Sequence, residues 1–163
     1  MKKTLTNVCI FLFLSLIIGC SAAPQLSQMQ KRQLTTKMIE GSYENVFRAS
    51  MTVIQDQGYI IKNTDMNSGL LVAYMDKETA AGSQFLQAFF LGQVTDKNTV
   101  IEVTATISKL SEKSQEIRMI IQETNYSGSG SKNDIETILD QEVYQNMFNE
   151  ITLEVKRREA MNK

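Results

Sequence analysis

The sequence predicts an α+β domain, in which an antiparallel sheet of about five strands carries two helices packed on one face, in the chain order β-α-β-β-β-β-α. Three observations predict this class. Residues 99–110 alternate between apolar and polar side chains, as a strand with one buried face does. Residues 42–57 and 140–158 each carry one apolar stripe at helical spacing. Turn-forming residues separate the predicted strands.

The first strand and the first helix are predicted side by side. In residues 34–39 the side chains of Leu34, Thr36 and Met38 alternate, which indicates a strand. Ser42 suits the N-cap of a helix that ends at Gly58, a residue able to take the left-handed conformation. The buried face of this helix is expected to hold Val46, Phe47, Ser50, Met51 and Ile54.

Two hairpins and a helix complete the prediction. Residues 59–64 and 70–75 are β-rich and flank a five-residue turn, so they should pair as an antiparallel hairpin. The strand over 99–110 should pair with 116–124, and a last helix should start at Asp140, with Asn133-Asp134 as an alternative, earlier cap. The inward side chains of the second hairpin are expected to be Ile101, Val103, Ala105, Ile107, Ile117, Met119 and Ile121.

Composition limits the function classes. The 163 residues carry 17 Lys and Arg against 18 Asp and Glu, a net charge of -1, which argues against a nucleic-acid binder. The chain has no histidine, the commonest general base and a common zinc ligand. We therefore expect a single non-enzymatic domain with no metal and no cofactor. Ser-Lys and paired-carboxylate chemistry stay open in principle, although no spacing singles out such a pair.

The N-terminus carries the most specific signal in the chain. Lys2 and Lys3 precede an apolar run over residues 8–18, which is shorter than the ~20 residues that span a bilayer. The run ends in Ile17-Ile18-Gly19-Cys20, which resembles the lipobox of bacterial lipoproteins. The resemblance implies cleavage between Gly19 and Cys20, transfer of a diacylglycerol to the Cys20 thiol, and acylation of the new amine by a fatty acid such as palmitate. The alternatives are an ordinary secretory signal or an uncleaved membrane helix.

Residues 1–19 would then be a signal peptide, 20–33 a lipidated tether and 34–160 a single domain; alternatively, Leu26 and Met29 of the tether pack on the domain. The mature chain, 20–163, has 15 Lys and Arg against 18 Asp and Glu, a net charge of -3. Ser21 rather than Asp follows the cysteine, and in enteric-type bacteria the lipoprotein pattern then implies sorting to the outer membrane. We expect an anchor on its periplasmic face; in a bacterium with one membrane, the same anchor would face outward.

The mature chain also resembles a poorly characterised family of small bacterial outer-membrane lipoproteins. The similar segments are residues 53–61, then Asp65 and the glycine-aliphatic run at 69–73, and a closing helix at 140–148. The family commonly has proline where this chain has Gln141. The resemblance covers most of residues 30–160 and implies the same α+β architecture.

One connection between strands stands out as a candidate contact surface. Residues 79–94 are longer than a hairpin requires, and long connections often carry function. An exposed apolar patch there would contact a protein partner or the membrane; alternatively, the same residues close one end of the core. The candidate residues are Phe85, Leu86, Phe89 and Phe90.

Three further patterns are better explained by structure than by binding. The Ser/Gly loop at 126–131, followed by Lys132, lacks the Gly-Lys-Ser/Thr ending of a phosphate loop. Asp65, Asn67 and Glu102 lack the spacing of a calcium loop. The cations at 156–158 suit a helix C-terminus, although they could also meet anionic lipid.

Two functional hypotheses follow from these residues. The first is a non-catalytic, lipid-anchored envelope protein that acts as an interaction or accessory module of an outer-membrane or secretion assembly. The alternative is a carrier or sensor that binds an apolar small molecule or lipid beneath the helices, in a cavity lined by Ile, Met and Phe.

Overall fold

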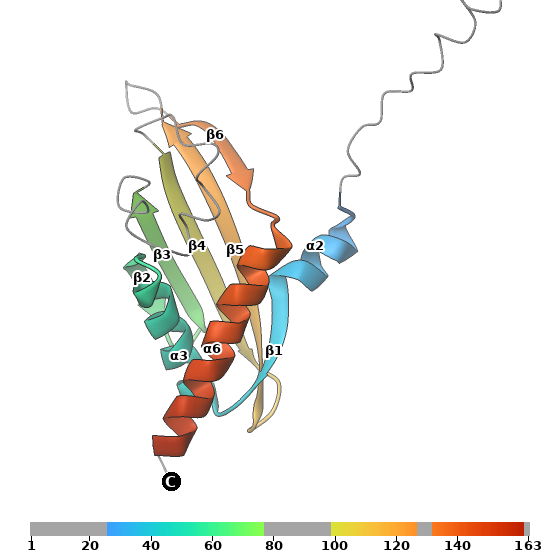
Figure 1. The fold of residues 1–163 in the computed structure, drawn as a ribbon, viewed down its shortest axis with the longest axis vertical. Helices are drawn as coiled ribbons and strands as arrows, with labels where there is room; N and C mark the ends of the chain where they lie inside the picture. The colour runs from blue at the N-terminus through green and yellow to red at the C-terminus, as the bar shows by residue number, and fades with distance from the viewer. Residues whose placement is uncertain (1–25, 77–98, 127–131, 162–163) are drawn as a thin grey trace, which may run out of the picture.

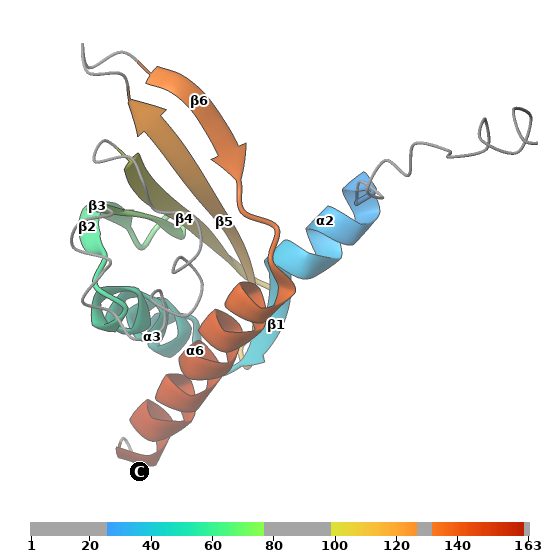
Figure 2. The same ribbon diagram turned by 45° about the horizontal axis from the view of Figure 1, so that its top comes forward.

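The computed structural model describes residues 26–76, 99–126 and 132–161. One antiparallel sheet forms a layer, helices α3 and α6 cover one of its faces, and the short helix α2 projects from its edge (Figures 1 and 2). This arrangement confirms the α+β class. The helices are α2 (Gln28–Thr35), α3 (Tyr43–Asp56) and α6 (Gln141–Met161). The strands are β1 (Thr36–Glu40), β2 (Ile60–Asp65), β3 (Leu70–Asp76), β4 (Thr99–Lys109), β5 (Ser114–Tyr126) and β6 (Lys132–Thr137).

The sheet is organised around β5. The strand order is β1-β5-β4-β3-β2, and β6 also pairs with β5. Along the edge that faces away from β4, the first residues of β5 pair with β1, from Ser114 opposite Glu40 to Arg118 opposite Thr36. The last residues of β5, from Gln122 to Tyr126, pair with β6. One long strand therefore has two partners in succession on the same edge.

A tyrosine from α6 closes the gap between those two partners. The amide of Ile121 donates to the hydroxyl of Tyr144 at 3.2 Å, and this hydroxyl donates to the carbonyl of Ile138 at 3.1 Å. The amide of Ile138 in turn donates to the carbonyl of Ile121 at 2.9 Å. Burial raises the pKa of Tyr144, so its hydroxyl keeps the proton that it donates. Because a buried amide without a partner is costly, this side chain fixes the start of α6 on the sheet.

The core lies between the sheet and the two helices, as the period-two pattern predicts. The inward residues of β4 and β5 that the sequence predicted are all buried. They pack with residues of β3 and with the apolar stripes of α3 and α6. The helix residues buried in this core include Val46, Phe47, Ile54, Tyr144, Met147, Phe148, Ile151 and Val155. Met51, expected in the same stripe of α3, is partly buried and packs against the core.

Both helix starts and the first hairpin agree with the sequence. The Ser42 side chain accepts from the Asn45 amide at 3.3 Å, and the Asp140 carboxylate accepts from the Glu142 amide at 2.8 Å. Strands β2 and β3 pair as predicted, and Gly69 in their turn has φ +73°. A side chain at Gly69 would overlap the carbonyl oxygen of Ile107, so the turn needs a glycine to approach β4.

The N-terminal part of the domain differs from the prediction. Residues 28–33, assigned to the tether, form α2, which starts with a capping box between Ser27 and Gln30. Leu34 lies in this helix, so β1 begins at Thr36 rather than at Leu34. Ile39 is 2% exposed, whereas Met38 is 67% exposed.

Strand β6 was not predicted. It pairs with β5 by main-chain hydrogen bonds, but its sequence is polar and its one large apolar side chain, Ile135, is 51% exposed. A strand without a buried face lacks the alternation by which strands are detected in a sequence.

The part of β5 around Ile121, where its partner changes from β1 to β6, is called the junction in β5. Replacing Tyr144 by Phe tests it. The substitution keeps the ring but leaves the Ile121 amide without its acceptor, so the free energy of unfolding in urea should fall by about 1–3 kcal/mol. Tyr74→Phe, on the half-exposed outer face of β3, is the control and should change stability by less than about 0.5 kcal/mol. Equal stabilities of the two variants would contradict the assigned role.

Candidate interaction groove

Several residues singled out from the sequence lie outside the described part of the chain. They are the cleavage and lipidation residues Gly19 and Cys20, and the apolar connection residues Phe85, Leu86, Phe89 and Phe90. Among the helices that the structure describes, none is long and apolar enough to cross a membrane.

A groove of about 580 Å³ lies between α2, β1 and the first turns of α6, and we call it the α2–α6 groove. Its apolar lining comes from four side chains: Leu26, Leu34, Leu139 and Phe148. Its polar lining consists mainly of amides, contributed by both helices: Gln30, Gln33, Gln141, Gln145 and Asn149. Lys37 is the one charged residue in the lining, and Thr36 completes it.

The groove follows from the junction in β5. Helix α2 runs directly into β1, and α6 follows β6 after a short connection, so both helices meet where β5 changes partners. The capping box of Ser27 and Gln30 fixes the start of α2, with the Ser27 amide donating to the Gln30 side chain at 2.8 Å. The capping pattern could have been found in the sequence, but the meeting of α2 with α6 depends on the tertiary fold.

The lining suits recognition rather than proton transfer. Each amide side chain offers both donors and an acceptor, as a polypeptide main chain does. The hydroxyl oxygen of Thr36 is buried at the base of this lining and has no hydrogen-bond partner within the described residues. Leu34 and Phe148 supply an apolar contact beside these polar groups. Such a mixed surface is typical of protein interfaces.

The residues considered for cation binding do not converge. The Asp65 carboxylate accepts from the Asn67 amide at 2.9 Å, which is the turn chemistry expected from the sequence. Glu102 instead lies 3.4 Å from the ammonium of Lys62. Hydrogen bonds from Ser68 and Asn67 lower the pKa of Asp65. In the part of the chain that the structure covers, no cluster of three or more His, Cys, Asp or Glu residues could hold a metal ion.

A second groove, of about 880 Å³, lies at the other end of β1. It is lined by acidic residues from three elements or turns, Glu40, Glu112 and Glu159, together with Lys113. Gly41 borders it with φ +146°, and a side chain there would come within 2.6 Å of Val155. This glycine is therefore explained by the close approach of α6 to the end of β1.

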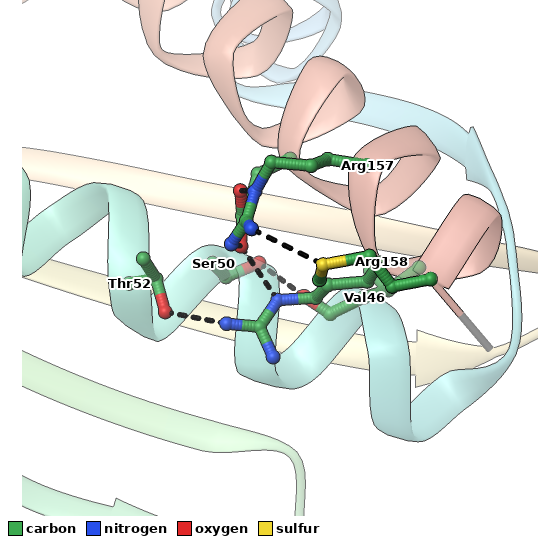
Figure 3. Close-up of polar contacts among 7 residues, drawn as sticks. Val46, Ser50, Thr52, Arg157 and Arg158 are labelled. Atoms are coloured by element: carbon green, nitrogen blue, oxygen red, sulfur yellow. Dashed lines mark hydrogen bonds and ion pairs between the residues drawn. The ribbon is translucent and has the colours of Figure 1, made fainter.

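Two of the cations near the end of α6 are used within the fold (Figure 3). Arg158 lies 2.7 Å from Glu154 and donates to the Thr52 hydroxyl of α3 at 2.9 Å, which links the two helices. Arg157 also pairs with Glu154, at 2.5 Å. The Glu154 side chain is only 11% exposed. Hydrogen bonds and charge from the two arginines lower the pKa of Glu154.

Comparison with known proteins assigns the chain to no family. No protein-family model matches the chain, and no curated protein matches it significantly in sequence. The functional inference therefore rests on the residues and their geometry.

Replacing Glu154 by Gln tests the contact between α3 and α6. Because folding lowers the pKa of Glu154, its carboxylate stabilises the fold above its unfolded pKa, and this contribution is lost as the pH falls through the folded pKa. The variant should be less stable than the parent by about 1 kcal/mol at neutral pH, and the difference should shrink as the pH falls from neutral into the acid range. Urea unfolding across this pH range measures it.

The matched control is Glu44→Gln, which removes the exposed ion pair with Arg48 and should cost less than about 0.5 kcal/mol at neutral pH. A Glu154→Gln deficit that persists undiminished in acid would rule out the ionised carboxylate as its cause.

Proposed function

We propose that this protein is a non-catalytic lipoprotein, anchored through lipid on Cys20, that acts as an interaction or accessory module at the periplasmic face of an outer membrane. The lipobox motif supports the anchor. The observation that carries the interaction role is the α2–α6 groove, with its amide side chains around an apolar contact. The groove supports binding of a protein segment by an envelope partner belonging to an outer-membrane or secretion assembly.

The position of the groove relative to the anchor supports the same proposal. Leu26, which lines the groove, lies six residues after Cys20. Six extended residues reach roughly 20 Å, so the groove would stay close to the lipid surface. A partner embedded in or attached to that membrane would then meet the groove without crossing a long gap.

The carrier alternative receives less support from the described residues. It requires an apolar cavity beneath the helices, lined by Ile, Met and Phe. In the described part of this layer, such side chains pack against one another: Met119 and Ile121 of β5 lie in the same buried cluster as Met147 and Ile151 of α6. The α2–α6 groove lies outside this layer and has many amides, which suits a polypeptide better than an acyl chain.

Photocrosslinking in intact cells tests the interaction role. A photoreactive amino acid at Gln145 should capture one reproducible envelope protein, because this residue lines the groove. The same probe at Phe89 tests the apolar connection as a contact surface. The control is Ile60, which is exposed on β2 at the opposite edge of the sheet.

Capture at Gln145 but not at Ile60 would support the groove, and capture only at Phe89 would move the contact to the apolar connection. Absence of any product at Gln145 and Phe89, identified by mass spectrometry, would contradict the interaction role. Lipid extracted from the purified protein would then favour the carrier alternative.

A further inference from the structure

We infer that α2 docks on an anionic lipid surface, the one that carries the protein's own anchor, and so sets the orientation of the domain. The inference rests on the proposed anchor at Cys20. It adds a second function to α2, whose one side lines the groove while other residues meet the bilayer.

Charge is distributed unevenly along the mature chain. Residues 20–39 contain Lys31, Arg32 and Lys37 and no acidic residue, a net charge of +3. Residues 40–163 contain 12 Lys and Arg against 18 Asp and Glu, a net charge of -6. The basic part is the part that directly follows the anchor, and cations beside a bilayer are attracted by anionic lipids. The rest of the domain is repelled by the same surface.

The basic residues of α2 are available for such a contact. Within the described part of the chain, neither Lys31 nor Arg32 forms an ion pair. Arg157 and Arg158 of α6, the other cationic pair, are both bound to Glu154. The cations of α2 can therefore bind a lipid headgroup without first breaking an ion pair, whereas those of α6 cannot.

The exposed side of α2 and its projection from the sheet suit a helix that lies at a membrane interface. Gln30, Gln33 and Leu34 line the groove, whereas Met29 does not and is 73% exposed. Figure 2 shows that α2 leaves the sheet and points its N-terminal end away from it. Met29 can insert into the interface while Arg32, three residues on and on the same side of the helix, meets a phosphate.

The length of the connection keeps α2 at the surface. Ser27, the N-cap of α2, is seven residues after Cys20, a reach of roughly 23 Å when extended. The helix itself is about 12 Å long. Attraction to a charged surface is screened over about 10 Å, a separation well within this reach, so α2 can come close enough to the bilayer to experience it. Of the described elements, α2 is the first after the anchor.

The chain has no tryptophan, so one substitution creates a unique fluorescent probe. The lipidated mature protein carrying Met29→Trp is placed in vesicles of phosphatidylethanolamine and phosphatidylglycerol, with some lipids brominated near the headgroup. Leu153→Trp, on an exposed part of α6, is the matched control. The Met29→Trp probe should be quenched and its emission shifted to the blue, whereas the Leu153→Trp probe should keep the emission of an exposed indole.

Charge dependence completes the test. Lys31→Gln with Arg32→Gln, in the Met29→Trp background, should lower the ratio of docked to undocked helix by roughly ten-fold or more. Lys62→Gln with Lys113→Gln makes the same change of charge elsewhere and should leave the ratio nearly unchanged. Vesicles of phosphatidylcholine should weaken docking as the first pair of substitutions does.

Vesicle flotation separates the two claims. If the protein floats with the vesicles but the Met29→Trp probe is no more quenched than the Leu153→Trp probe, docking of α2 is wrong and the anchor stands. If the Lys62→Gln and Lys113→Gln pair reduces quenching as much as the α2 pair does, docking is not specific to α2 and the inference also fails. If the purified chain carries no lipid, the anchor and the inference fail together.

Discussion

The outer edge of β5 pairs with two strands in succession. The positions of α2 and α6 depend on how the main-chain hydrogen bonds along this edge are satisfied. Strand β1 pairs with its first part and β6 with its last part. Between them, the Ile121 amide donates to the Tyr144 hydroxyl and the Ile121 carbonyl accepts from the Ile138 amide. Since β1 continues from α2 and β6 leads to α6, this one junction positions both helices that form the groove.

The candidate function follows from the same junction. Helices α2 and α6 are separated by more than 100 residues in the sequence, and they come together because their adjoining strands share β5. Their amide side chains then line one groove, next to the segment that follows the proposed lipid anchor. A surface built on the sheet itself can hold its geometry while a partner binds, which lowers the entropy lost on association.

The sequence predicts the elements that have one buried face. The alternation in β4 and β5 and the apolar stripes of α3 and α6 are direct consequences of burial against one core. Strand β6 was missed because its side chains from Asp134 to Thr137 are exposed and it joins the sheet through main-chain pairing with β5. The predicted start of β1 was wrong because Leu34 belongs to α2, and the buried residue of the strand is Ile39. The groove could not be predicted, since its lining comes from both ends of the mature chain.

The most direct test of the functional account is the intact mass of the protein isolated from membranes of the bacterium that makes it. We expect a chain that begins at Cys20 and carries a diacylglycerol and an additional acyl chain, and we expect Cys20→Ala to lose this modification. A chain that retains residues 1–19, or one cut elsewhere and free of lipid, would contradict the anchor on which the proposed role of α2 and the groove depends.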